Sequence, residues 1–241
     1  MKHTKIITNF AVLLVSSLTV FYVQADDGVV RAKVSLGYST YSSPYGNNEI
    51  STNYATQGLG LSYVWPSSVF IDLSTKVSAT DASYNAKNVF GGQVNSDQKF
   101  SRTENTLTLG KSTENGTQVN GGIFAADTVL SMAQLGQFSQ KILGLTAGAG
   151  KGFLIDDGRS GLIGISGAFA LLNATNKDRY GVSVNSNLSY GISLGAVYNY
   201  PLTKSVSVLA DGKFQTYFIK YPTFSGDERI LSGTLSLLAQ F

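Results

Sequence analysis

The chain has 241 residues and a formal net charge of +3; 14% of its residues are charged, 43% are hydrophobic and 11% are aromatic. Charged residues usually make up about a quarter of a soluble protein, so the charge content is low, and 26 glycines stand beside only 4 prolines. The chain lacks cysteine, so it would use an oxidising compartment without disulfides. Together with the absence of long helix-like stretches, this composition favours an all-β fold.

The first 25 residues have the pattern of a secretory signal peptide. Lys2 and Lys5 precede an apolar run over residues 6–23, and the small-residue site Val23-Gln24-Ala25 follows. The run is close to the minimum length of a membrane-spanning helix, which is the alternative interpretation, but Thr, Ser and Asn interrupt it. We therefore predict cleavage after Ala25 and a single domain over 26–241. Its 16 basic and 15 acidic residues leave a net charge of +1, which argues against nucleic acid as a partner.

From there on, segments of the chain alternate between apolar and small or polar residues, which is the period of a β-strand with two different environments. In the first segment, Val30, Ala32 and Val34 alternate with basic and small residues. Ten such segments follow one another: 29–41, 58–65, 69–78, 103–111, 119–126, 143–150, 163–171, 188–200, 206–218 and 229–241.

The predicted connections also alternate in length. The longer, polar ones are 42–52, 80–101, 127–140, 173–185 and 220–228; the shorter ones are 66–68, 112–116, 155–159 and 201–204. Long loops on one side and short turns on the other are typical of outer-membrane barrels. An even strand number places the N-terminus and the C-terminus of the barrel domain together at the periplasmic side, where the turns are short. We predict an all-β, transmembrane, antiparallel up-and-down β-barrel of ten strands; eight and twelve strands stay open, and a soluble sandwich is the alternative fold.

Aromatic residues are placed as two membrane-interface belts would require. Those beside the predicted periplasmic turns or the C-terminus are Tyr63, Trp65, Phe153, Tyr198, Tyr200 and Phe241. Those beside the predicted outer loops are Tyr38, Tyr41, Phe218 and Tyr221. The alternative explanation is that Tyr and Phe are simply good strand formers.

The final segment, RILSGTLSLLAQF, carries its apolar set on one face and ends in Phe241. It resembles the C-terminal signature of Gram-negative outer-membrane β-barrel proteins, without indicating a subfamily. The resemblance implies that Phe241 is an assembly signal and that the protein lies in the cell outer membrane. It also implies that outer-membrane lipid, periplasmic chaperones and the outer-membrane assembly machinery are partners. The oligomeric state is not indicated.

Most catalytic chemistry is excluded by composition. The only histidine is His3, inside the predicted signal peptide, so residues 26–241 contain neither His nor Cys. This removes Ser–His and Cys–His nucleophiles and the common zinc sites. The chain resembles in architecture the omptin proteases, outer-membrane phospholipase A, lipid A palmitoyltransferase and lipid A deacylase, but it cannot supply their histidine. Asp156-Asp157 beside Gly158 favours a turn over an acid–base pair. We predict no enzyme activity and no cofactor or metal.

The charged residues of the predicted inward face are the remaining candidates for a functional site: Arg31, Lys33, Asp72, Lys76, Asp211 and Lys213. One interpretation is a narrow, porin-like channel for small solutes or ions with a weak preference for anions. The other is a structural barrel, because narrow barrels are filled by their own side chains. A surface-binding barrel that acts through its outer loops, notably 80–101, is an alternative function, and a secreted soluble β-protein is a second one.

Overall fold

The structure is a computed structural model that describes residues 28–241 apart from 46–47, 80–81, 87–97, 133–135 and 156–160. The predicted signal peptide and the Asp156-Asp157 pair lie outside the described residues. Within the described part of the chain, no helix is long and apolar enough to cross a membrane.

The described chain consists of β-strands and their connections. In chain order the strands are β1 Val29–Tyr45, β2 Asn48–Val64, β3 Val69–Ser78, β4 Tyr84–Ala86, β5 Gln98–Ser112, β6 Thr117–Met132, β7 Gly136–Ile155, β8 Gly161–Lys177, β9 Ser183–Asn185, β10 Ser189–Pro201, β11 Val206–Phe218 and β12 Glu228–Gln240.

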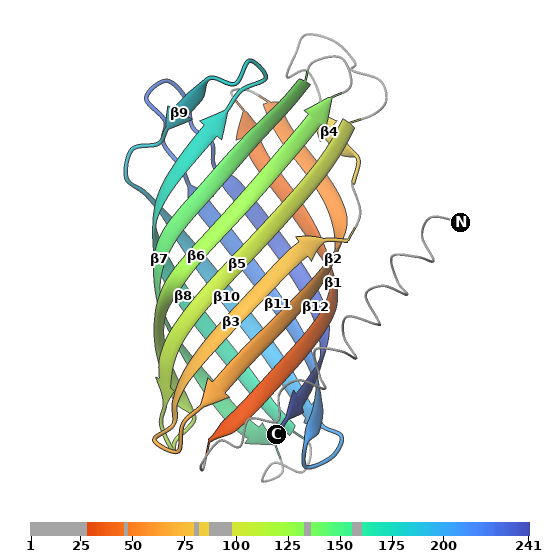
Figure 1. Ribbon diagram of the computed structural model, residues 1–241, viewed down its shortest axis with the longest axis vertical. Helices are drawn as coiled ribbons and strands as arrows, with labels where there is room; N and C mark the ends of the chain where they lie inside the picture. The colour runs from red at the N-terminus through yellow and green to blue at the C-terminus, as the bar shows by residue number, and fades with distance from the viewer. Residues whose placement is uncertain (1–27, 46–47, 80–81, 87–97, 133–135, 156–160) are drawn as a thin grey trace, which may run out of the picture.

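The ten long strands form one closed antiparallel barrel (Figure 1). Each pairs with the long strand that follows it in sequence, and β1 also pairs with β12, which closes the ring. The short strands β4 and β9 only extend the wall beside β2 and β8. The predicted ten-stranded, up-and-down topology is therefore confirmed.

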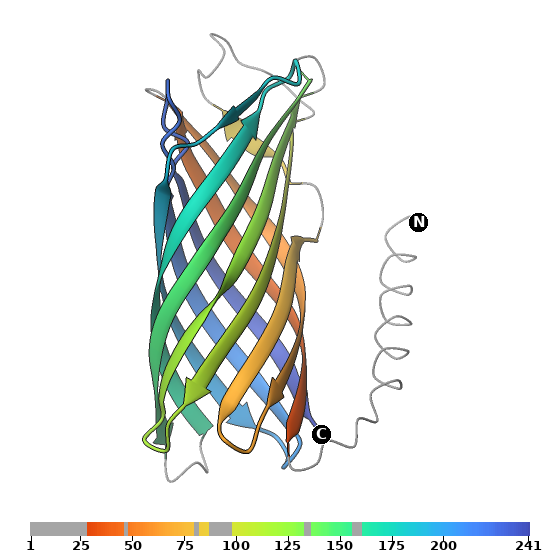
Figure 2. The same cartoon turned by 60° about the vertical axis from the view of Figure 1, so that its left-hand side comes forward.

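One end of the barrel carries short turns, and the C-terminus lies at that end (Figure 2). Tight connections join β2 to β3, β5 to β6 and β10 to β11 there, and Gly116 supplies the positive φ of 79° that the turn after β5 needs. The backbone of Phe241 pairs with Val30 of β1, with N···O distances of 2.9 and 3.2 Å. We name this end the periplasmic end and the opposite end the outer end, after the arrangement that outer-membrane barrels have.

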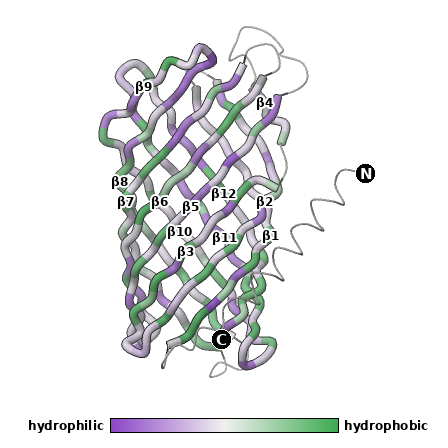
Figure 3. The backbone as a smooth tube through the Cα atoms, in the orientation of Figure 1, coloured by the Kyte–Doolittle hydropathy of each residue, from purple (hydrophilic) through white to green (hydrophobic). Residues whose placement is uncertain are grey.

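Exposed apolar side chains cover the outward face of the periplasmic half. Leu36 of β1 faces Leu235 of β12, and these side chains are 66% and 63% exposed. The other exposed Leu and Ile residues of this band include Leu59, Leu61, Ile71, Leu73, Leu107, Leu109, Ile123, Leu143, Leu145, Ile163, Ile165, Ile192, Leu194, Leu231 and Leu237. Figure 3 shows hydrophobic and hydrophilic positions alternating along the strands. An apolar band around a closed barrel is the lipid-facing surface of a transmembrane barrel.

The strands continue well beyond this band, which contradicts part of the loop prediction. β7 has 20 residues, which at ~3.3 Å per residue and a tilt of ~40° span roughly 50 Å, about twice the ~25 Å of the apolar band. The loops predicted at 42–52 and 127–140 are wrong, because β1, β2, β6 and β7 run through most of them. The loops predicted at 80–101 and 173–185 are too long, because β5 begins at Gln98 and β8 ends at Lys177.

The physical reason is a change in which face is apolar. Leu171 of β8 is 47% exposed on the outward face, whereas the next residue, Leu172, is 1% exposed inside the barrel. Leu231 and Ile230 of β12 differ in the same way. In the outer half the wall faces outward with polar residues, and its apolar side chains form an internal core: Tyr41, Ile50, Tyr54, Phe100, Phe124, Ala126, Ile142, Ala170, Leu172, Ala174, Tyr217, Ile219, Tyr221 and Ile230.

This exchange also corrects the predicted outer aromatic belt. Tyr41 and Tyr221 are each 4% exposed and belong to the internal core, so they do not face lipid. Tyr38 is exposed as expected, and Phe218 stacks on Tyr190 at a ring-centroid distance of 4.9 Å. At the periplasmic end, exposed members of the predicted belt are Trp65, Phe153, Tyr198, Tyr200 and Phe241, and Tyr63 packs edge-on against Trp65.

Candidate functional site

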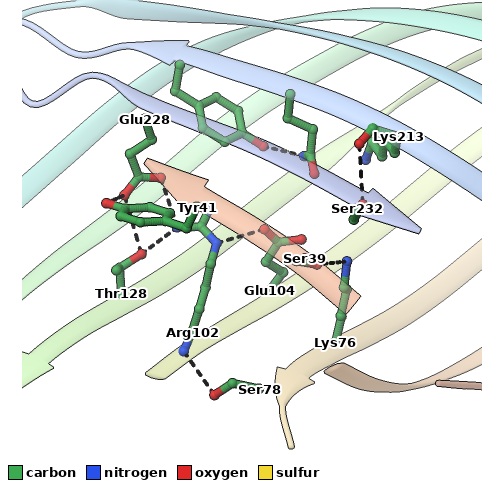
Figure 4. A network of polar contacts seen from close by, with 12 residues as sticks. Ser39, Tyr41, Lys76, Ser78, Arg102, Glu104, Thr128, Lys213, Glu228 and Ser232 are labelled. Carbon is green, nitrogen blue, oxygen red and sulfur yellow. Dashed lines mark hydrogen bonds and ion pairs between the residues drawn. The ribbon is translucent and has the colours of Figure 1, made fainter. Parts of the chain in front are cut away.

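A buried cluster of polar and charged side chains crosses the barrel in its outer half (Figure 4). Glu228 of β12 is fully buried, and one of its carboxylate oxygens accepts a hydrogen bond from Arg102 of β5 at 2.8 Å. The other oxygen accepts hydrogen bonds from Tyr41 at 3.0 Å, Gln140 at 2.9 Å and Thr128 at 3.3 Å. These five residues come from five strands, and we refer to them as the Glu228 cluster.

The cluster spans the full width of the barrel. Thr128 lies on β6, which is five strands from β12 whichever way the wall is followed. Thr128 nevertheless contacts Glu228 directly, and it also accepts a hydrogen bond from Arg102. Side chains from opposite walls that are in hydrogen-bond contact leave no open passage between them.

Arg102 has a second acidic partner. Its Nε donates to Glu104 at 2.8 Å, and Glu104 faces Lys76 across the β5–β3 pair. Charges taken out of water carry a large desolvation cost that only close pairing offsets, so Arg102 and Glu228 depend on each other. Charge-assisted hydrogen bonds of this length are among the stronger ones in proteins.

Aromatic rings fill the space around the cluster. Phe100 is fully buried and packs against Tyr41 and Tyr54 at ring-centroid distances of 5.0 and 4.9 Å. Phe124 of β6 stacks on Tyr217 of β11, which lies four strands away around the ring, at 5.5 Å. The rings and the Glu228 cluster together form a plug made of the side chains of the wall.

Glycines in the wall make room for this plug. A β-carbon on Gly191 would lie 2.4 Å from the ring of Tyr217, and one on Gly144 would lie 2.5 Å from a methyl group of Leu172. A β-carbon does not approach atoms it is not bonded to this closely, so Tyr217 and Leu172 each use the gap left by a glycine on the neighbouring strand. These two glycines thus serve the packing of the interior.

The periplasmic half of the interior is polar and more open. Inward-facing positions there are mostly Ser, Thr and Gly, and a cavity of about 150 Å³ beneath the plug is lined in part by Thr106, Asn120, Thr146, Lys213 and Gln215. The six charged residues proposed from the sequence occupy inward positions by register: Arg31 and Lys33 on β1, Asp72 and Lys76 on β3, Asp211 and Lys213 on β11. Lys76 donates to Ser39 at 3.4 Å.

Sequence reasoning missed the three residues at the centre of the plug. Glu228 is the last residue of the predicted loop 220–228, and Arg102 falls between the predicted loop 80–101 and the predicted segment 103–111, so neither lies within a recognised alternation. Glu104 could have been found, because it has the same parity as the inward positions opposite Leu107 and Leu109 in the segment 103–111. For Arg102 and Glu228 the signal is the charge of the residue itself. Each lies one position before a recognised alternating segment, 103–111 for Arg102 and 229–241 for Glu228.

One buried donor at the outer end has no partner among the described residues. The hydroxyl oxygen of Tyr221, in the connection between β11 and β12, lies buried without a hydrogen bond. Its ring stacks on Phe224 at 4.5 Å. Burial, with the negative charge of Glu228 adding to it, raises the pKa of Tyr221, so the hydroxyl stays protonated.

A closed ten-stranded antiparallel barrel with an apolar outer band, short turns at one end and longer connections at the other has the fold of the bacterial outer-membrane β-barrels. The solved structures that are similar to it include the following two. The outer-membrane protease OmpT from Escherichia coli aligns with a TM-score of 0.61 at 9% sequence identity, over 88% of this chain and 97% of OmpT. The translocator domain of the autotransporter NalP from Neisseria meningitidis aligns with a TM-score of 0.52 at 10% identity, over 100% of this chain and 98% of that domain.

At these identities the likeness concerns the fold alone. No protein-family model and no curated protein sequence matches the chain.

Proposed function

We propose that the protein is an integral outer-membrane barrel without catalysis, closed by its own side chains, and that it acts as a structural or surface-binding barrel rather than as an open porin. The observation that carries this proposal is the direct contact of Thr128 and Arg102 with Glu228 across the lumen. Of the two interpretations of the interior, this contact favours the plugged one over the narrow channel.

The apolar band supports a location in the outer membrane. A secreted soluble β-protein would expose Leu36, Leu145 and Leu235, each more than 60% accessible, to water. Soluble proteins rarely expose a continuous apolar surface of this extent. Outer-membrane lipid, the assembly machinery and periplasmic chaperones are the partners that this location requires, and Phe241 remains the proposed assembly signal.

The composition supports the absence of catalysis. The similar fold of OmpT belongs to a protease, but this chain has no histidine after His3 and no cysteine. The charged residues at the centre of the barrel are engaged with one another, and the Glu228 carboxylate accepts four hydrogen bonds. A carboxylate held in this way has a structural role, because both of its oxygens are bound to side chains of the wall.

The test is electrical recording from purified protein refolded into planar lipid bilayers. We expect no steady conductance from the native protein, with heat-dependent gel mobility of the same sample as proof that the barrel has formed. A variant that loses both charges and two rings of the plug (Arg102→Ser, Glu228→Ser, Phe100→Ser and Phe124→Ser) should conduct. Steady conductance from the native barrel would refute the plugged interpretation.

Binding through the outer loops is the second candidate function, since a plugged barrel has only its ends and its wall to offer a partner. Most of the loop 80–101 lies outside the described residues. Deleting residues 87–97 and measuring attachment to host cells or phage would test this candidate, with barrel formation checked on the same gel.

A further inference from the structure

A cavity of about 210 Å³ lies at the outer end of the barrel, on the outer side of the Glu228 cluster. Its floor includes Tyr41, Thr128 and Gln140, the three uncharged residues that hydrogen-bond Glu228. Its walls are largely apolar and come from five parts of the chain: Ile50, Leu130, Phe138, Val182, Val184 and Phe224. The cavity is thus an apolar chamber with a polar floor.

Two side-chain amides supply hydrogen-bonding groups to this chamber. Gln140 donates through Nε2 to the Gly226 carbonyl and to Glu228. Its Oε1 lies 3.0 Å from the position that a β-carbon would take on Gly226, which itself lines the cavity. This oxygen remains able to accept a hydrogen bond. Asn176 also lines the cavity, and its side chain has no hydrogen bond among the described residues.

The electrostatics of the cavity select against anionic ligands. The floor itself offers a cation no free carboxylate oxygen, because Arg102, Tyr41, Thr128 and Gln140 already bind Glu228. The wall carries the carboxylate of Asp178, whose Oδ1 accepts from two backbone N–H groups. An anion would meet that carboxylate, and in a partly buried site the repulsion is poorly screened.

The volume sets the size of the ligand. An apolar cavity of about 150 Å³ binds benzene, and drug-sized ligands occupy pockets of roughly 300 Å³ or more. A cavity of about 210 Å³ therefore suits one ring with a small substituent. We propose that this outer cavity is a binding site for small, uncharged ring compounds that carry one hydroxyl group, such as phenols, with the ring among Leu130, Phe138 and Phe224 and the hydroxyl donating to Gln140.

The experiment is fluorine NMR of 4-fluorophenol with the full-length protein refolded in detergent, read against protein-free micelles. We expect saturable shift changes with a dissociation constant on the order of 1 mM, the range that a ligand of about eight heavy atoms reaches. Unlabelled phenol should displace the probe. 4-Fluorotoluene should bind about five-fold more weakly, because it cannot make the hydrogen bond, and 4-fluorobenzoate should not bind.

Two variants locate the site. Val184→Trp fills the cavity from β9, which is outside the ten long strands of the barrel, and should weaken 4-fluorophenol binding at least about ten-fold, beyond the effect of any single hydrogen bond. Leu188→Trp is the matched control, because Leu188 is 79% exposed in the same connection and does not line the cavity. Both should retain the heat-dependent gel mobility of the native barrel.

Three results would overturn the proposal. The first is no saturable binding to the native protein. The second is equal binding by the native protein and the Val184→Trp variant, which would place the probe elsewhere. The third is binding of 4-fluorobenzoate as tight as that of 4-fluorophenol. None of these depends on whether the barrel conducts, so the proposed function and this site fail separately.

Discussion

Glu228 is the residue on which the plug depends most. Its side chain is fully buried, and it balances Arg102, whose own side chain is 1% exposed. Replacing Glu228 by Gln keeps the shape but leaves Arg102 with only Glu104 as an acidic partner. Because breaking a buried pair leaves an uncompensated charge, we expect Glu228→Gln to lower the free energy of unfolding by about 3–5 kcal/mol. Urea unfolding of the refolded barrel in lipid vesicles measures this.

The matched control is an ion pair on the surface of the same barrel. Lys141 and Asp127 approach to 3.8 Å, with side chains that are 71% and 41% exposed. Water screens such a pair, so Asp127→Asn should change the free energy of unfolding by about 0–1 kcal/mol. Equal losses in the two variants would show that the lumen around Glu228 is hydrated rather than closed.

At the scale of the element, β10 shows how two environments share one strand. Leu194 is 59% exposed on the outward face at mid-strand, and Ser193 beside it faces inward and lines the polar cavity beneath the plug. We expect Leu194→Arg to cost about 2–4 kcal/mol, the range for a basic residue at the bilayer midplane. Ser193→Arg should cost less, since the lumen is polar there.

The same unfolding measurement on both β10 variants checks this prediction. A larger loss for Ser193→Arg would mean that the strand is turned the other way or that the lumen at this level has no room for a long side chain. A neutral, similarly long change, Leu194→Met, separates the effect of charge from that of altered packing.

The alternation of apolar and polar residues predicts the strands correctly where one face contacts lipid and the other a polar lumen. It fails in the outer half of the barrel, where the outward face is polar and the inward face is partly apolar. Along β1, residues from Val30 to Tyr38 alternate because lipid lies on one side and a polar lumen on the other. Beyond Tyr38 the outward face becomes polar while Tyr41 enters the core, so the pattern changes phase, although the backbone pairing with β2 continues to Tyr45. The sequence therefore predicts a loop where a polar stretch in fact continues the strand.

The candidate site was hidden for the same reason. The inward charges of the periplasmic half, such as Lys33 and Asp211, lie within recognisable alternation and could be assigned to the lumen by parity. Contacts between Arg102 and Glu228 join positions 126 residues apart in sequence. Arg102 and Glu228 come together only because the ring of ten strands closes. A pattern read within one segment of the sequence cannot predict a contact over that separation.

At the scale of the whole molecule, the plug divides the interior into an outer ligand-sized chamber and a periplasmic polar vestibule. The vestibule still carries a small excess of positive charge. When Arg102 and Glu228 are removed, the inward charges that remain on the described strands are four basic (Arg31, Lys33, Lys76 and Lys213) and three acidic (Asp72, Glu104 and Asp211).

This excess predicts the selectivity of the opened barrel. In the variant with Arg102→Ser, Glu228→Ser, Phe100→Ser and Phe124→Ser, reversal potentials across a salt gradient should show a weak preference for anions, because the charges that line a narrow pore determine its selectivity. Adding Arg31→Ser and Lys33→Ser leaves two basic and three acidic residues inside, so the preference should reverse to cations. The outward pair Lys111→Ser and Lys151→Ser removes the same charge from the other face of the wall and should leave the reversal potential unchanged. A selectivity that follows the outward pair, or that ignores Arg31 and Lys33, would mean that ions do not pass along the lumen described by the strand register.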